Sequence, residues 1–302
     1  MPIELVPHNK HGLTLASRLI AGAGAVGYAD AWPPGITAAV FGAIITPPIS
    51  WRGRRGQAPP RLAETPAGFV LASGDHNPGY RRVIDDHALD WHRLGTPIIM
   101  ALASSTPDDW DRLAAHLEEE PSVAGIELHV PEGVRSVDVN TWVGTVRRAT
   151  TLPLLVKLPS AQTTALAPAA TQAGADALVI GSPPLAAGRP LAAVSYGRRP
   201  EERSVLSPTE PSDNGTLVEG PIAGPAAFPF TLRALRAVAG LSLGLPLIAA
   251  GGICRAEDAE RCFDAGAVAV QIRSLLWIDP AAAVRLAERL KEDGRPGTAP
   301  QG

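Results

Sequence analysis

The feature that most constrains the fold is a regular alternation of short apolar runs and amphipathic stretches along the 302 residues. Runs of strand length occur at 17–24, 40–46, 96–103, 123–130, 153–158, 177–181, 246–251 and 268–272. Helical patterns lie between or after them, at 32–39, 80–94, 107–119, 136–149, 161–173, 229–240, 255–265 and 280–292. This α/β pattern predicts a (β/α)8 TIM barrel. A doubly wound open sheet is the alternative, but no GxGxxG sequence follows the first strand with an acid about 20 residues later.

Three segments fall outside this repeat. Residues 1–16 carry two short extended runs and predict a small N-terminal hairpin. The connections 47–79 and 182–223 are long and follow strand ends, so both are expected on the carboxyl face, where barrel active sites lie. Loops of this length are usually functional or disordered. We expect the first to be an ordered cover and the second to have a mobile tip, in a single barrel domain over 1–293 with a disordered tail at 294–302.

Composition and charge exclude several classes of protein. A hydrophobic content of 45% and a net charge of −3 are typical of a soluble globular protein and give no indication of a nucleic-acid partner. No apolar run approaches the roughly 20 residues that span a bilayer, and the N-terminus lacks a signal-peptide pattern, which predicts a cytoplasmic protein without membrane contact. Cys254 and Cys262 share one helical pattern without CxxC spacing, so we expect neither a disulfide nor a metal site.

Small and polar residues follow the last two predicted strands. Gly251 and Gly252 end the seventh strand, and Arg273 and Ser274 end the eighth. In (β/α)8 barrels these two loops commonly bind a phosphate group through backbone N–H groups. The alternative is that the glycine pair only makes a tight turn from strand to helix.

Lysine is rare in this chain, which makes one position conspicuous. Of 27 basic residues, only Lys10, Lys157 and Lys291 are lysines. Lys157 lies on a predicted core strand, where a cation requires a reason. Either it contacts a ligand, or its stem follows the strand and its ammonium reaches solvent.

Several sequence segments, in order along the chain, resemble dihydroorotate dehydrogenase. Their sequences include AGAGAVGY, GAIIT, PLLVKL and GAVAVQIRS. The matched segments are 21–28, 42–46, 58–79, 125–128, 153–158, 174–180, 220–235, 249–253 with 257–259, and 266–274. The resemblance is closest to the soluble class whose partner subunit carries an iron–sulfur cluster and FAD.

This resemblance implies an FMN-binding barrel. It places Lys157 where the family's lysine contacts the flavin, and it assigns Asn77 to the substrate. It also assigns to the cofactor Ala23, Gly24, Thr46, Gly224, Gly251, Gly252, Arg273 and Ser274. The family usually has glycine at the position of Arg273, so this arginine either pairs with the phosphate or obstructs its approach.

The chain departs from the family at the reactive positions. Pro47 stands in place of a second lysine, and Leu71, His129 and Gly181 stand where the family holds orotate with asparagines. Aligned without a gap, Glu132 occupies the position of the catalytic base. If the neighbouring proline is matched instead, no base remains there. Glu132 and His129 are therefore the candidate catalytic residues.

Two functions follow from these observations. The first is a dihydroorotate dehydrogenase-like, FMN-dependent oxidoreductase acting on CH–CH groups, a step of pyrimidine biosynthesis in the family, with orotate specificity doubtful here. The second is a non-redox binding or regulatory barrel that retains a phosphate or nucleotide site. By analogy with the family, the expected partners are a small-molecule substrate, a second copy of the chain and an iron–sulfur/FAD electron-transfer subunit.

Overall fold

Eight parallel strands close into a barrel in the order β10-β11-β14-β15-β3-β5-β8-β9. The computed structural model describes residues 2–103, 106–188 and 217–292. The barrel strands are β3 (Leu19–Ala21), β5 (Ala43–Ile45), β8 (Ile98–Leu102), β9 (Gly125–His129), β10 (Leu154–Pro159), β11 (Ala177–Ser182), β14 (Leu247–Ala250) and β15 (Ala267–Ile272). Each coincides with a predicted apolar run to within one residue at its ends or lies inside it. The (β/α)8 prediction is confirmed.

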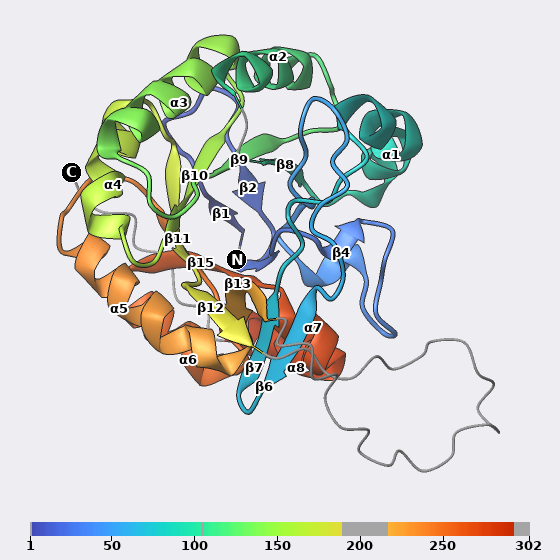
Figure 1. Cartoon of the computed structure of the whole chain (residues 1–302), viewed down its shortest axis with the longest axis vertical. Coiled ribbons are helices and arrows are strands. Elements are labelled where there is room, and N and C mark those ends of the chain that lie inside the picture. The colour runs from blue at the N-terminus through green and yellow to red at the C-terminus, as the bar shows by residue number, and fades with distance from the viewer. Residues whose placement is uncertain (1, 104–105, 189–216, 293–302) are drawn as a thin grey trace.

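A ring of helices surrounds the barrel (Figure 1). These are α1 (Tyr80–Leu94), α2 (Pro107–Glu118), α3 (Ser136–Ala149), α4 (Thr163–Gln172), α5 (Phe228–Ala239), α6 (Ala256–Asp264) and α8 (Pro280–Glu292). Each matches a predicted helical pattern. The start of α2 shows why a helix begins where the sequence predicts it. Thr106 Oγ1 accepts a hydrogen bond from the backbone N–H of Asp109 at 3.2 Å. This cap satisfies one of the free N–H groups at the helix N-terminus.

The helix predicted at 32–39 was wrong. That stretch contains only the start of a short 3-10 helix, η1 (Ala38–Val40). Gly35 takes a left-handed φ of 77°, and Thr37 is extended with a ψ of 166°. Neither conformation continues an α-helix.

Strand alternation divides the core into two parts. One part lies between the barrel and the helices and includes Leu154 and Val156 of β10. The other fills the barrel interior and includes Leu155 of the same strand and Ile248 of β14. Successive side chains on a strand face opposite sides, so Lys157 must also face inward.

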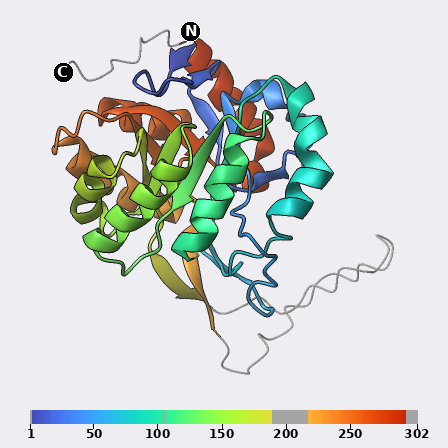
Figure 2. The same ribbon diagram turned by 90° about the horizontal axis from the view of Figure 1, so that it is seen from above.

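The N-terminal hairpin closes one end of the barrel. Strands β1 (Ile3–Glu4) and β2 (Thr14–Leu15) pair antiparallel, as predicted. Leu5, Leu13 and Leu15 are buried in the interior part of the core. Figure 2 shows this hairpin and the β12–β13 pair at opposite ends of the molecule.

A second sheet, which the sequence did not predict, joins the two long connections. It contains β6 (Leu62–Thr65), β7 (Gly68–Leu71), β12 (Leu185–Gly188) and β13 (Val218–Ala223), in the order β12-β13-β7-β6. The first connection is thus ordered, as expected of a cover. The expected mobile tip of the second and the expected disordered tail lie outside the described residues. A short helix, α7 (Ser274–Ile278), was also not predicted. No helix in the described ranges has the length and hydropathy needed to cross a bilayer.

Candidate cofactor and active site

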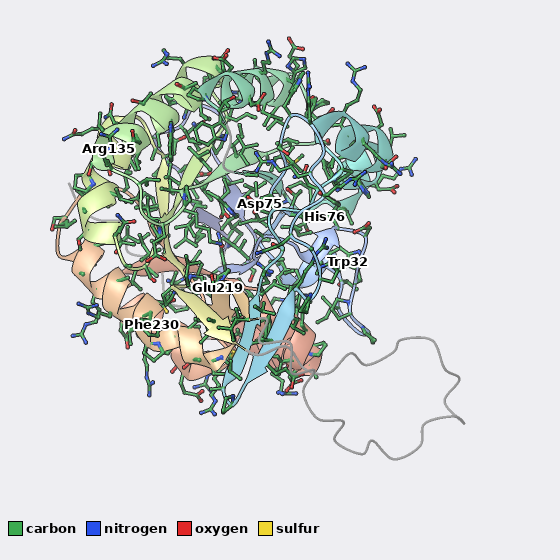
Figure 3. All side chains as sticks on the ribbon, viewed as in Figure 1. Trp32, Asp75, His76, Arg135, Glu219 and Phe230 are labelled. Carbon is green, nitrogen blue, oxygen red and sulfur yellow. The ribbon has the colours of Figure 1, made fainter. Side chains whose placement is uncertain are left out.

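A cavity of about 350 Å³ opens at the carboxyl ends of the barrel strands. This volume is within the range of small-molecule sites. Its wall includes residues at the ends of β3, β5, β9, β10, β14 and β15, together with the β13 end and the loop after β7. Asp75 and His76, both labelled in Figure 3, belong to that loop and line the cavity. The cavity is therefore lined by residues of both the barrel and the second sheet.

The floor of the cavity is a polar network from three barrel strands. Strand alternation turns Glu127 and His129 of β9, Lys157 of β10 and Gln271 of β15 toward the interior. His129 Nε2 lies 2.6 Å from Glu127 Oε1. Gln271 Nε2 donates to Glu127 Oε2 at 2.5 Å, and Lys157 Nζ donates to Gln271 Oε1 at 3.0 Å. Lys157 Nζ is also 3.7 Å from Glu127 Oε1, so the network contains a buried ion pair.

Burial and neighbouring charge act in opposite directions on this pair. Burial alone would raise the pKa of Glu127, but the charge of Lys157 and the hydrogen bonds from His129 and Gln271 lower that pKa to about 2. Burial lowers the pKa of Lys157, and the charge of Glu127 opposes this effect. Glu127 is therefore a carboxylate at neutral pH.

The opposite side of the cavity offers backbone donors. Strands β14 and β15 are neighbours, and the residues that follow them line the cavity together with Gly224. Within the described part of the chain, the backbone N–H groups of Gly224, Gly251, Gly252 and Arg273 donate to no backbone or side-chain acceptor. Free N–H groups in the wall of a cavity can bind an anion.

The glycine pair also has a structural role. Gly252 has a φ of 74°, and a Cβ atom there would lie 2.2 Å from the backbone nitrogen of Phe228. Gly251, with a φ of 110°, would place a Cβ 2.8 Å from the carbonyl oxygen of Gly181. Packing of the α5 start against this loop therefore requires glycine independently of any ligand. The tight-turn interpretation is confirmed, and it is compatible with a phosphate site at the same loop.

Arg273 supplies a cation beside these donors. Its guanidinium carbon lies 4.8 Å from the ring centre of Trp277. No acid in the described residues pairs with it, and burial lowers its pKa to about 10, so it stays charged at neutral pH. The cavity remains open with Arg273 in its wall. Its cation is available to an anionic ligand.

The structure brings most of the predicted site residues together. Those that line the cavity are Ala23, Gly24, His129, Lys157, Gly224, Gly251, Gly252, Arg273 and Ser274. Thr46 does not reach it, because its Oγ1 accepts from the N–H of Ala101 at 3.1 Å and donates to the carbonyl oxygen of Pro47 at 3.1 Å. Thr46 instead ties β5 to β8.

Asn77 and Glu132 also lie outside the cavity lining. Asn77 is buried, donates to the carbonyl oxygen of Asp75 at 2.7 Å and accepts from the N–H of Gly79 at 3.0 Å. It therefore holds the turn that carries Asp75. Glu132 is exposed in the loop after β9, where the N–H of Gly133 donates to another side chain.

Sequence reasoning missed Glu127 and Gln271 as site residues. Both are polar residues within otherwise apolar strands, GIELH and AVAVQI. A polar side chain at an inward strand position was the available signal.

Comparison with known proteins identifies the relatives of this chain. The family profile for dihydroorotate dehydrogenase matches residues 7–293. The catalytic subunit of dihydroorotate dehydrogenase B (NAD(+)) from Desulforudis audaxviator is 32% identical over 293 residues, which cover 93% of this chain and 90% of that protein. The Geotalea daltonii protein of the same name gives the same identity and coverage.

The chain belongs to the dihydroorotate dehydrogenase family. The fold agrees with this. The crystal structure of DHODH from Eimeria tenella in complex with ferulenol superimposes with a TM-score of 0.70, at 17% identity, over 97% of this chain and 84% of that one. At this identity the likeness shows a shared fold.

Proposed function

We propose that this protein is a dihydroorotate dehydrogenase-like, FMN-dependent oxidoreductase. The observation that carries the proposal is a single cavity that is lined by backbone donors for an anion and by His129 and Lys157, both held from behind by buried Glu127. A cofactor with a phosphate group at one end and a planar reactive ring at the other matches these two parts of the cavity. Relatives named as dihydroorotate dehydrogenase B catalytic subunits support the same function.

The residues present fit FMN. The free N–H groups of Gly224, Gly251 and Gly252 and the guanidinium of Arg273 would hold its phosphate. Ala23, Gly24 and Ser274 belong to the same wall. Lys157 would hold its ammonium beside the flavin ring, which gains negative charge on reduction. When bound, FMN supplies the capacity to accept a hydride.

His129 is the proposed acid–base residue. It lines the cavity, whereas Glu132 is exposed and outside the lining. Leu71 and Gly181 also line the cavity and offer no side-chain hydrogen bonds to a substrate. Because a buried polar ligand group without a partner costs about 1–3 kcal/mol, we propose a substrate with fewer polar groups than dihydroorotate.

Electron transfer from the cofactor requires a separate acceptor. An iron–sulfur cluster is usually held by four cysteines, and the chain contains only Cys254 and Cys262. We therefore propose a partner subunit that carries its own redox group, consistent with the relatives' designation as catalytic subunits.

Anaerobic mixing of FMN-loaded protein with saturated cyclic amides, dihydroorotate among them, tests the proposal. Loss of the oxidised flavin absorbance within seconds supports it. The second candidate, a binding barrel without redox turnover, is favoured by Leu71, Gly181 and Pro47 at positions where the family has polar groups. A flavin that binds but stays oxidised with every compound of the series would support that candidate.

A further inference from the structure

We infer that buried Glu127 is a positioning residue that fixes His129 in the tautomer whose Nδ1 is the free base at the cavity. This inference rests on the proposed function. It concerns the hydrogen-bond network of β9, β10 and β15, and it supplies the proton acceptor missing from the loop after β9.

The contact between the two residues is short, and only His129 is accessible from the cavity. Glu127 Oε1 lies 2.6 Å from His129 Nε2, and its side chain has no solvent exposure, at 0%. The His129 side chain is 23% exposed and lines the cavity. Glu127 therefore lies behind the imidazole, where a substrate reaches the histidine but not the carboxylate.

The surrounding network defines the charge of Glu127. Its Oε2 accepts from Gln271 Nε2, and Gln271 Oε1 accepts from Lys157 Nζ at 3.0 Å. This amide orientation suits a carboxylate on one side and an ammonium on the other. The reverse orientation would face an NH₂ group toward an ammonium and an oxygen toward a carboxylate.

A carboxylate only accepts hydrogen bonds, so the proton of a neutral His129 must be on Nε2. Nδ1 then carries a lone pair, and it has no hydrogen-bond partner among residues 2–103, 106–188 and 217–292. The family's asparagine at this position cannot take up a proton. Histidine at position 129 can take up a proton, so the network of this chain contains a base that the family's asparagine does not supply.

The proposed step is the oxidation of a C–C single bond. A C–H bond next to the substrate carbonyl breaks, and its proton goes to Nδ1 of His129. Oxidation of the C–C single bond to a double bond also removes a hydride from the neighbouring carbon, and FMN, when bound, would supply the acceptor for that hydride. The resulting imidazolium keeps its Nε2–H bond to Glu127, which stabilises the positive charge.

His76 is the competing base. It lines the cavity at the exposed loop after β7, and no carboxylate within hydrogen-bond distance orients it in the described residues. A fixed tautomer requires a hydrogen-bond partner such as a carboxylate or a backbone carbonyl, and His76 has none in the described residues. The two histidines therefore differ in a property that can be measured.

Nitrogen NMR of histidine-labelled protein reads the tautomer directly, with His129→Gln used for assignment. At neutral pH we expect His129 to carry its proton on Nε2, in the apoprotein and with FMN. A proton on Nδ1, or an imidazolium that persists through pH 9, would overturn the inference. Because this readout needs no turnover, it is separate from the proposed function, which fails if FMN is neither bound nor reduced.

Glu127→Gln provides the second test. Its amide can donate to Nε2 and so shift the proton to Nδ1, the effect that lowers kcat about 10⁴-fold when the aspartate of a Ser-His-Asp triad becomes asparagine. We expect kcat to fall by about 10²–10⁴ with KM changed little, and His129→Asn to lose turnover while still binding FMN. His92→Asn, on the exposed face of α1, is the matched control. The inference would be overturned if only His76→Asn lost turnover, or if Glu127→Gln kept both the His129 tautomer and the rate of the native protein. If that variant does not fold, the NMR result on the native chain decides.

Discussion

Removing Lys157 alone should destabilise the apoprotein strongly. Its Nζ lies 3.7 Å from Glu127 Oε1, and the two side chains are 12% and 0% exposed. At an effective dielectric constant of about 20, two charges at this distance attract by ~4 kcal/mol. Lys157→Met leaves the carboxylate buried and without its cation, so we expect the free energy of unfolding to fall by about 3–5 kcal/mol.

The double variant Glu127→Gln/Lys157→Met separates charge from packing. It removes both charges, and we expect it to recover most of the loss, because replacing a whole buried pair is often neutral. Urea unfolding followed by tryptophan fluorescence measures each difference, with the exposed Lys291→Met as a control that should change little. A single variant within about 1 kcal/mol of the native protein, or a double variant no more stable than Lys157→Met, would refute the reasoning.

The pair also sets a pH dependence. The folded pKa of Glu127, about 2, is below its value in the unfolded chain, so its contribution is present above the unfolded pKa. It is lost as the pH falls through the window between the unfolded pKa and about 2. Native protein should therefore lose stability in acid more steeply than Glu127→Gln.

Three further outcomes are expected. Arg273→Ala should weaken FMN binding about 10-fold or more, because a charged hydrogen bond contributes roughly 1.5–3 kcal/mol, whereas the exposed Arg285→Ala should bind FMN normally in a fluorescence titration. Leu71→Asn should tighten orotate binding, measured as a flavin spectral shift, and unchanged affinity would contradict the assigned position of Leu71 in the substrate part of the cavity. Gly252→Ala should cost more stability in urea than Gly35→Ala, since both have positive φ but only Gly252 meets backbone atoms; equal losses would show that the contact with α5 is unimportant.

The barrel was predictable because its strands are mostly apolar runs, which is typical of parallel strands buried on both faces. The second sheet was not, because its strands lie within long connections rich in Gly and Pro, and β6, LAET, has no strong apolar pattern. Its stability comes from pairing between segments far apart in the sequence, Ile222 with Val70 and Ala223 with Phe69. Such pairing leaves little trace in either segment alone.

Site residues were predictable where strand alternation determines which way a side chain faces. Lys157 and His129 lie at inward positions, and both line the cavity. Thr46 continues the outward position of Ile44, which packs in the core outside the barrel, and so it misses the cavity. Glu132 lies beyond the end of β9, where alternation no longer fixes direction. The 2.6 Å contact of His129 with Glu127 depends on side-chain geometry that no sequence period encodes.

The most direct test of the account is the visible spectrum of the purified protein, before and after incubation with FMN and removal of free flavin. We predict a flavin absorbance that stays with the protein and is reduced, together with FMN affinity, in Arg273→Ala. Protein that remains colourless after incubation with FMN would contradict the proposal that the β14–β15 end of the cavity holds a flavin phosphate.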